Sequence, residues 1–354
     1  MKTIILTGGG TAGHCTPHFA LLDILRNRFD NIYYIGSTGG MEEKLVKEQG
    51  LPYYGIDTVK LIRNNLLKNV GLPFKFIKSV NQAKDILKNL KPDVVFSKGG
   101  YVGLPVTISA SKLKIPVVVH ESDLTLGLAN KIASKFAKHT LTSFESTAKS
   151  IKNGVYVGSP IREELFSIPK ETALKFWNFK NTLPVLLVTG GSQGAKALNK
   201  AVLSIASTLL KNFQILHVVG KGNLSNFTHP NYRQVEFADM KYCYPACDYC
   251  ISRAGANTAF ELIALKKPTL FIPLPKGSSR GDQIDNAKYF ENKNLSLTLL
   301  QENLNDKTLL CNVKKLITNK NRLISNMNNL PLKHTNEEIC KILCNYWLDC
   351  IFVI

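Results

Sequence analysis

Four glycine-rich turns in the sequence present backbone N–H groups that suit a phosphate. The turns occupy residues 8–13, 99–103, 190–194 and 253–255, and each follows a short apolar segment that is typical of a strand. Such N–H groups, together with the partial positive charge of a following helix start, favour an anion. A single turn of this kind often serves packing alone, whereas four of them indicate a phosphate-bearing ligand in a cleft between two domains.

His14, which ends the first of these turns, is the candidate base. Histidine has an ordinary pKa of about 6.5, so it can take a proton from a hydroxyl group at neutral pH. Glu121 follows His120 at the predicted end of another strand, and it is the alternative base or the partner that orients the base. The competing interpretation of His14 is a histidine that only binds or packs at a helix start. No Asp-x-Asp pair follows a predicted strand, so we expect the chemistry to need no metal.

The segment 252–261 suits a nucleoside diphosphate. A strand ends at Arg253, Gly255 turns the chain, and a helix begins near Ala256. The N–H groups at that helix start can hold a diphosphate, because they have no partner within the helix. Glu261 lies further along the same helix, where its carboxylate could bind ribose hydroxyls. Alternatively, Glu261 is a simple solvated helix residue.

Strands that alternate with helices must position these turns. Short apolar segments predict the strands, and the stretch 74–90, which lies between two prolines, predicts a helix. The predicted strands cover residues 3–7, 32–36, 94–96, 116–120, 185–189, 214–219, 249–252 and 269–272. Near-continuous apolar strands that alternate with helices are typical of parallel sheets covered on both faces. In such sheets ligands bind beyond the carboxyl ends of the strands, which is where the glycine turns lie.

The chain length of 354 residues suits two domains. The segment 6–9 (Leu-Thr-Gly-Gly) resembles the segment 188–191 (Val-Thr-Gly-Gly), so a second domain of the same kind is expected to begin there. We place the first domain at residues 1–160 and the second at residues 161–335. A helix over residues 336–350 is expected to dock back onto the first domain.

The composition excludes some classes of protein. There are 45 Lys and Arg residues against 26 Asp and Glu residues, which makes a formal net charge of +19. This excess suits nucleic acid, an anionic membrane, or an A·T-rich genome that favours lysine codons. No nucleic-acid motif is present, so no nucleic-acid partner is expected. The apolar runs are too short for a membrane span or a signal peptide, and the eight cysteines form no disulfide framework. We therefore expect a cytoplasmic chain with structural thiols.

A nicotinamide dinucleotide fits the first glycine turn poorly. Gly8, Gly10 and Gly13 make a loose G-x-G-x-x-G motif. That motif requires an acidic residue at the end of the second strand to hold the ribose. Here the second strand is followed by no acid until Glu42, so a dinucleotide enzyme is the less favoured alternative.

The chain resembles the MurG glycosyltransferases of peptidoglycan synthesis over nearly its whole length. Each matching segment alone is weak evidence for the family, but together and in this order the segments are specific for it. The matching segments cover residues 8–14, 97–102, 120–123, 126–130, 158–162, 190–194, 252–261 and 280–287. The resemblance implies the GT-B fold, an α/β fold with two Rossmann-like domains that face a cleft.

The resemblance also implies the reaction. N-acetylglucosamine (GlcNAc) would move from UDP-GlcNAc to the C4 hydroxyl of MurNAc in undecaprenyl-diphosphoryl-MurNAc-pentapeptide (lipid I), with inversion, to give lipid II. UDP-GlcNAc would be a substrate, and no cofactor is expected. The alternatives that stay open are another GT-B glycosyltransferase acting on a lipid, a UDP-sugar epimerase, and a basic lipid-binding or nucleic-acid-binding module without catalysis.

The resemblance carries site residues over by motif. Glu261 would bind the ribose, while Gln283 and Asn286 would bind the hydroxyls of the sugar. The donor site would comprise Thr11, Ala12, Gly13, Asp123, Arg162, Ser192, Ala238, Arg253, Ala256, Asn257, Thr258, Ala259, Phe260, Glu261, Gln283 and Asn286. The loops for the diphosphate of the acceptor would comprise Gly8, Gly9, Gly10, Gly99, Gly100 and Tyr101. His14 and Glu121 are the catalytic candidates.

The segment 120–123 departs from the family pattern. Many members have His-Glu-Gln-Asn where this chain has His-Glu-Ser-Asp, and the Asn of the common form contacts the donor. An ionised Asp123 accepts hydrogen bonds but cannot donate them. We therefore include Asp123 in the donor site only as a candidate.

A basic and apolar stretch over residues 60–91 suits a membrane surface. Lipid I lies in the inner leaflet, so the acceptor domain is expected to bind anionic lipids at the cytoplasmic face of the cell membrane, as a peripheral protein. The basic residues are Lys60, Arg63, Lys68, Lys75, Lys78, Lys84, Lys88 and Lys91, with Asp85 as the one acid. The interleaved apolar residues are Leu61, Ile62, Leu66, Leu67, Leu72, Phe74, Phe76 and Ile77. Such side chains insert shallowly while the cations meet anionic head groups. The alternative is a helix packed on its own sheet, which is expected for Val80, Ile86, Leu87 and Leu90.

Overall fold

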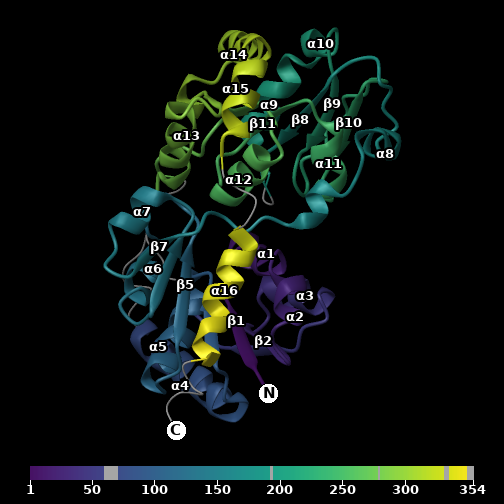
Figure 1. Ribbon diagram of the computed structural model, residues 1–354. Coiled ribbons are helices and arrows are strands. Elements are labelled where there is room, and N and C mark those ends of the chain that lie inside the picture. Colours follow the sequence, from purple (N-terminus) through teal and green to yellow (C-terminus); the bar gives the residue numbers. More distant parts are fainter. Residues whose placement is uncertain (60–70, 192–193, 278–279, 331–334, 349–354) are drawn as a thin grey trace. The chain divides into compact units, whose positions relative to one another are not determined.

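The chain forms two compact units in the computed structural model (Figure 1). The structure describes residues 1–59, 71–191, 194–277, 280–330 and 335–348. The first unit contains Met1–Arg162 together with the C-terminal segment, and the second unit contains Glu163–Pro331. The division therefore falls two residues after the boundary at 160 that the sequence suggests.

The first unit is built on a seven-stranded sheet in the order β3-β2-β1-β4-β5-β6-β7. All of its described strand pairs are parallel. The strands are β1 (Thr3–Thr7), β2 (Asn31–Ser37), β3 (Tyr53–Ile56), β4 (Val94–Ser97), β5 (Val117–Glu121), β6 (His139–Thr142) and β7 (Gly154–Tyr156). The helices are η1 (Ala12–His14), α1 (Thr16–Phe19), α2 (Leu22–Arg26), α3 (Met41–Glu48), α4 (Leu72–Leu90), α5 (Gly100–Lys112), α6 (Leu128–Ala133), α7 (Glu145–Lys149) and α16 (Thr335–Leu348).

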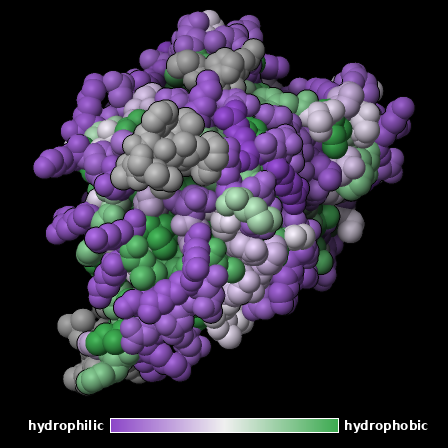
Figure 2. All heavy atoms as spheres, turned by 60° about the horizontal axis from the view of Figure 1, so that its bottom comes forward, coloured by the Kyte–Doolittle hydropathy of each residue, from purple (hydrophilic) through white to green (hydrophobic). Residues whose placement is uncertain are grey.

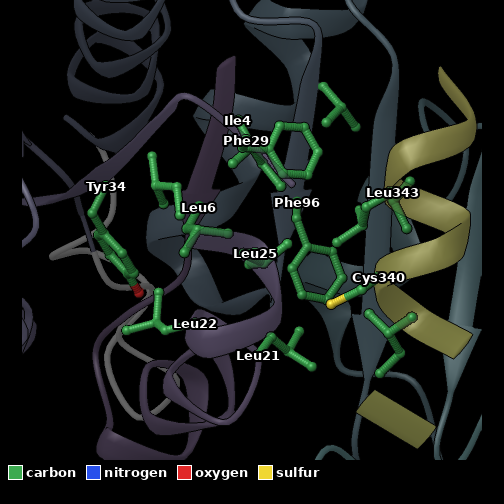
Figure 3. Packing of buried hydrophobic residues seen from close by; sticks show 14 of the residues in the cluster. Ile4, Leu6, Leu21, Leu22, Leu25, Phe29, Tyr34, Phe96, Cys340 and Leu343 are labelled. Carbon is green, nitrogen blue, oxygen red and sulfur yellow. The ribbon is translucent and has the colours of Figure 1, made fainter. Parts of the chain in front are cut away.

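The two faces of this sheet are covered by different helices because successive side chains of a strand point to opposite sides. Ile4 and Leu6 of β1 belong to a core cluster with Leu25 of α2 and Cys340 of α16 (Figure 3). Ile5, which lies between them in the sequence, belongs to a second cluster that includes residues of α4 and α5. The near-continuous apolar strands are thus buried on both faces, as the sequence predicts.

The C-terminal helix α16 is part of the first unit. Asn336 at its start donates to the carbonyl oxygens of Ala20 and Ile161 at 3.2 and 2.8 Å, and its Oδ1 accepts from the N–H of Ile161 at 3.1 Å. Arg28 forms an ion pair with Glu337 at 2.9 Å. These contacts hold the start of the helix against the segment that contains α1 and α2 and against Ile161.

The second unit repeats the architecture with a six-stranded parallel sheet in the order β10-β9-β8-β11-β12-β13. Its strands are β8 (Val185–Thr189), β9 (Gln214–Val218), β10 (Tyr232–Val235), β11 (Tyr249–Ser252), β12 (Thr269–Phe271) and β13 (Leu297–Thr298). Its helices are η3 (Glu163–Phe166), α8 (Lys170–Phe176), α9 (Lys196–Ser204), α10 (Ala206–Leu209), α11 (Met240–Ala246), α12 (Ala256–Ala264), α13 (Asp282–Asn292), η4 (Gln301–Asn303), α14 (Asp306–Thr318) and α15 (Lys320–Asn328). Both units therefore have the parallel α/β architecture that the sequence predicts.

Three cysteines of the second unit are buried, unbridged thiols. Burial raises the pKa of Cys247 to about 11, and it also raises the pKa of Cys243 and of Cys250. A thiol that stays protonated is a poor metal ligand and a poor nucleophile.

Among the described residues, no group of three or more His, Cys, Asp or Glu side chains is placed to hold a metal ion. No helix in the same ranges has the length and apolar character of a membrane span.

Candidate functional site

Three loops follow neighbouring strands at the carboxyl end of the sheet of the first unit. Thr7 of β1 lies opposite Ser97 of β4, and Ser97 lies opposite Val119 of β5. The loops that follow these strands begin with Gly8, with Lys98 and with Ser122. Because the strands are parallel and in register, the structure brings together residues that are far apart in the sequence.

The first glycine loop is held by buried side chains of β2 and α3. The hydroxyl of Tyr34 donates to the carbonyl oxygen of Gly8 at 2.7 Å. The fully buried carboxylate of Glu42 accepts from the N–H of Gly10 at 3.2 Å and from the N–H of Ser37 at 3.0 Å. Glu42 thus supports the loop, a role that its distance from the glycine motif in the sequence does not indicate.

The first and second glycine loops pack so closely that side chains would not fit. Gly10 has a φ of 82°, and a Cβ atom there would collide with the ring of Tyr101. Gly100 has a φ of 76°, and a Cβ atom there would lie 2.6 Å from the carbonyl oxygen of Gly9. These positions require glycine both for backbone conformation and for space.

His14 lies at this junction and is partly exposed. Its Nδ1 is 2.8 Å from the hydroxyl oxygen of Thr11, and a Cβ atom on Gly100 would lie 3.5 Å from the same nitrogen. When Nδ1 carries the proton and donates to Thr11, Nε2 is the basic nitrogen. Ala12 and Gly13 lie in η1 between these residues.

Glu121 is buried at the end of β5 and holds the loop that follows. One carboxylate oxygen accepts from the N–H of Asp123 at 3.0 Å. The other accepts from the N–H of Gly127 and from the side-chain amide of Asn130, each at 3.0 Å. Both oxygens are therefore engaged, which favours an orienting role for Glu121 over that of a base. Asp123 is only partly buried.

His120 and Lys98 form a second buried group beside this loop. The ammonium of Lys98 lies 2.6 Å from Nδ1 of His120 and donates to the hydroxyl of Ser122 at 2.8 Å. Nε2 of His120 lies 3.0 Å from the carbonyl oxygen of Gly158, so it carries the proton of the ring. Lys98 is part of a segment that matches the family, but the sequence shows neither its burial nor its partners.

In the second unit, the turn before α12 is tied to the neighbouring elements. The guanidinium of Arg253 donates to the carbonyl oxygens of Ile272 and Pro273 at 2.8 and 3.1 Å and to the side chain of Gln301 at 2.6 Å. The fully buried Asn286 of α13 donates to the carbonyl oxygen of Ala254 at 3.2 Å. These contacts show how both residues position the turn, whereas direct contact with a donor stays a prediction.

The first turn of α12 presents its backbone and a few side chains. Gly255 precedes the helix and no side chain caps it, so the first N–H groups lack an intrahelical acceptor. Asn257, Thr258 and Glu261 are partly exposed, whereas three of the predicted site residues are buried. The buried residues are Ala256, Ala259 and Phe260. The carboxylate of Glu261 accepts from the hydroxyl of Tyr244 at 3.1 Å.

The remaining predicted donor residues lie in both units. Gln283 accepts from the N–H of Leu274 at 3.1 Å through its side-chain oxygen. Ala238 directly precedes Asp239, which caps α11, and Arg162 is the last residue of the first unit before the division. Ser192 lies outside the described residues.

Comparisons with known proteins define the class of protein. Residues 4–142 match the family model of the glycosyltransferase family 28 N-terminal domain, and residues 185–341 match that of the glycosyltransferase family 28 C-terminal domain. The structure of MurG from Acinetobacter baumannii has a TM-score of 0.76 at 24% identity and covers 97% of this chain and 99% of that chain. The UDP-GlcNAc 2-epimerase of Neisseria meningitidis has a TM-score of 0.69 at 14% identity over 98% of this chain and 100% of that chain. At these identities the two structures show the fold, which is the predicted GT-B fold.

Curated relatives narrow the class to one family. A protein of Lachnospira eligens is 47% identical over 89% of this chain and 90% of its own length. A protein of Clostridium botulinum strain Langeland is 48% identical over 88% of this chain and 89% of its own length. Both are named UDP-N-acetylglucosamine–N-acetylmuramyl-(pentapeptide) pyrophosphoryl-undecaprenol N-acetylglucosamine transferase. The chain belongs to this family of transferases, the MurG family.

Proposed function

We propose that the chain transfers GlcNAc from UDP-GlcNAc to the C4 hydroxyl of MurNAc in lipid I, with inversion, and so forms lipid II of peptidoglycan synthesis. The observation that carries this proposal is the identity of 47% over nine-tenths of the chain with a curated transferase of that name. The site geometry is compatible with each step, as follows.

The second unit would bind the donor. The uncapped first turn of α12 offers N–H groups to the diphosphate of UDP-GlcNAc, and negative charge is favoured at a helix N-terminus. Glu261 lies on the same helix, and its carboxylate would accept hydrogen bonds from the ribose. The amide nitrogen of Gln283 would face the sugar, because the side-chain oxygen is bound to Leu274.

The first unit would bind the acceptor and take its proton. The N–H groups of the interlocked loops 8–10 and 99–101 would hold the diphosphate of lipid I. Nε2 of His14 would take the proton of the C4 hydroxyl while the oxygen bonds to C1 of GlcNAc. The bond from C1 to the UDP oxygen breaks from the opposite face, so the configuration inverts. The charge that develops on UDP meets the helix N-terminus, which stabilises it.

A transfer assay tests the function. The protein is given UDP-GlcNAc with a labelled sugar and a water-soluble lipid I analogue that keeps the diphosphate. We expect a product with GlcNAc β-linked to C4 of MurNAc, which mass spectrometry and NMR identify. Conversion of the sugar nucleotide to its C2 epimer, without transfer, would instead support the epimerase alternative. Release of UDP without a new glycosidic bond would contradict the proposal.

The start of α4 supports a peripheral attachment to anionic lipids at the cytoplasmic face of the membrane. Phe74 and Ile77 are 80% and 57% exposed, and Lys75 and Lys78 lie beside them in the sequence. Figure 2 shows hydrophobic patches among hydrophilic side chains on the face that is turned forward. Residues 60–70, which belong to the same stretch of the sequence, lie outside the described residues. Further along the helix, Val80 and Leu87 are buried, as the packing interpretation predicts.

A further inference from the structure

Lys98 at the end of β4 is a buried base that the proposed mechanism does not use. Its side chain is 2% exposed, and both of its hydrogen-bond partners are uncharged. Ser122 offers a hydroxyl, and His120 offers a neutral ring because its Nε2–H donates to Gly158. Within the described ranges no carboxylate lies at ion-pair distance from the Lys98 nitrogen. When protonated, this lysine is therefore a buried cation without an anion in contact, which is costly.

The surroundings of Lys98 act on its pKa in opposite directions. Burial lowers the pKa of Lys98 to about 7, although the negative charges of Glu121 and Asp123 act to raise it. The two histidines near it add no charge of either sign. Burial lowers the pKa of His120 well below its ordinary range, and it lowers the pKa of His18 in α1 to about 3. An anion that binds nearby would therefore decide whether Lys98 is protonated at neutral pH.

Lys98 lies where both acceptor loops begin. Its N–H donates to the carbonyl oxygen of Thr7 at 2.9 Å, and a Cβ atom on Gly8 would lie 3.3 Å from the Cβ of Lys98. The next residues, Gly99 and Gly100, form the second loop and start α5. A charge at this place acts on anything bound at the two loops, and the protein interior screens it less than water does.

We propose that Lys98 is a positioning residue for the acceptor, and that binding of the diphosphate of the acceptor takes up a proton at the Lys98 amine. The inference rests on the proposed function, because the anion is the diphosphate of lipid I. Lys98 is buried and acts through the loops and Ser122. The proton comes from solvent and stays on Nζ while the diphosphate is bound.

The sign of the pH dependence follows from linkage. Below a pH of about 7 the free protein already carries the proton on Lys98, so acceptor binding is at its strongest. Above that pH, binding must include the uptake of a proton, so it weakens as the pH rises toward the raised pKa of the bound state. The diphosphate of the acceptor does not titrate in this range, so it adds no dependence of its own.

Steady-state kinetics with the water-soluble lipid I analogue test the proposal. For the wild type, the KM for the analogue should rise roughly tenfold between about pH 6 and about pH 8, while the KM for UDP-GlcNAc changes by less than about twofold. In Lys98→Met, which keeps the length of the side chain without the amine, the KM for the analogue should be high and independent of pH. Lys112→Met, which removes an exposed charge at the far end of α5, is the matched control and should keep the wild-type profile.

The pH at which the KM for the analogue begins to rise tests the electrostatic effect of Asp123 on Lys98. Asp123→Asn removes a charge that raises the pKa of Lys98, so the rise of KM should begin at a lower pH. An unchanged midpoint in Asp123→Asn would overturn the coupling. A flat wild-type profile, an unaltered profile in Lys98→Met, or an equal effect on the KM for UDP-GlcNAc would also overturn the proposal.

Calorimetry provides a measurement that does not depend on any variant. Binding of the analogue to the wild-type protein, in buffers of different ionisation enthalpy near pH ~7.5, should show the uptake of a substantial fraction of a proton. Zero uptake would overturn the proposal even when Lys98→Met does not fold, which thermal unfolding reveals. Proton uptake by the wild type that is lost in Lys98→Met, in a protein that transfers no GlcNAc, would contradict the proposed function and leave the inference about Lys98 supported.

Discussion

His14 and Thr11 are the residue pair on which the proposed proton transfer depends. His14→Ala should lower kcat by about 10²–10⁴, because the C4 hydroxyl loses its general base. The KM for UDP-GlcNAc should change little, because most of the predicted donor residues lie in the second unit. Thr11→Val removes the contact to Nδ1 and should cause a smaller loss, whereas Thr11→Ser keeps the hydroxyl. Steady-state rates of transfer measure all three variants. A His14→Ala enzyme within about threefold of the wild-type kcat would give the role of base to another group.

Glu261 is the residue that we expect to recognise the ribose. Glu261→Ala should cost about 1–3 kcal/mol of UDP binding, because the ribose hydroxyls lose their acceptor. Isothermal titration calorimetry with UDP measures the change. Tyr244→Phe is the matched control, since it removes the hydroxyl that donates to Glu261 but keeps the carboxylate. Equal losses in the two variants would show that Glu261 only packs with Tyr244, and no loss in either would remove Glu261 from the site.

The first turns of α4 form the element on which membrane attachment depends. Phe74→Ser and Lys75→Glu should each reduce co-sedimentation with vesicles that contain anionic lipid, because they remove an inserting side chain and a cation. Activity on the water-soluble acceptor should persist. Lys211→Glu makes the same charge change at an exposed lysine of the second unit, outside the stretch 60–91, so it is the control for Lys75→Glu. Phe166→Ser, at a side chain 57% exposed in the second unit, is the control for Phe74→Ser.

Salt separates the electrostatic contribution of the lysines to membrane attachment from the contribution of the inserting apolar side chains. Binding that depends on cations should weaken as the ionic strength rises, since salt screens exposed charges. Lys78 is a less clean target, because it forms an ion pair with Asp57 at 2.7 Å and its reversal also disturbs that contact. Equal binding to neutral and anionic vesicles at high salt would contradict the proposal for α4.

The molecule as a whole contains two units, and each has its own sheet. A ligand that binds one folded unit stabilises that unit by about 2.7 kcal/mol at a hundred times its Kd. UDP-GlcNAc should therefore raise the unfolding midpoint of the second unit more than that of the first. Hydrogen exchange followed by mass spectrometry resolves the two, with β8 and β11 as reporters for the second unit and β1 and β4 for the first. Equal protection of both sets would contradict a donor site that is built mainly from the second unit.

Strands at or near the margins of the two sheets are the ones that the sequence pattern does not predict. The predicted strands do not include β3, β7, β10 and β13, which lie at the margins of the two sheets. They also do not include β6, which lies next to β7 and has His or Thr at three of its four positions. Central strands are buried on both faces and are apolar throughout, so their sequences stand out. Edge strands are short and partly exposed, so their residues are mixed. Tyr232–Val235, for example, contains Arg233 and Gln234.

The sequence by itself determined the fold class, the family and the places of the glycine-rich turns. These features are local: a run of apolar residues followed by glycines predicts a strand and a turn without knowledge of any distant contact. Gly10 and Gly100, for instance, are recognisable as turn residues before the structure shows that the Tyr101 ring and the Gly9 carbonyl exclude any larger residue there.

Only the tertiary structure decided what the charged residues near the turns do. Glu42 supports the loop at Gly10, 32 residues away, and Lys98 contacts His120, 22 residues away, because parallel strands place the ends of distant segments side by side. Arg253 faces backbone carbonyls, which no spacing in the sequence reveals. The protonation of Lys98 depends on burial and on the charges around it, and both arise only when the chain has folded.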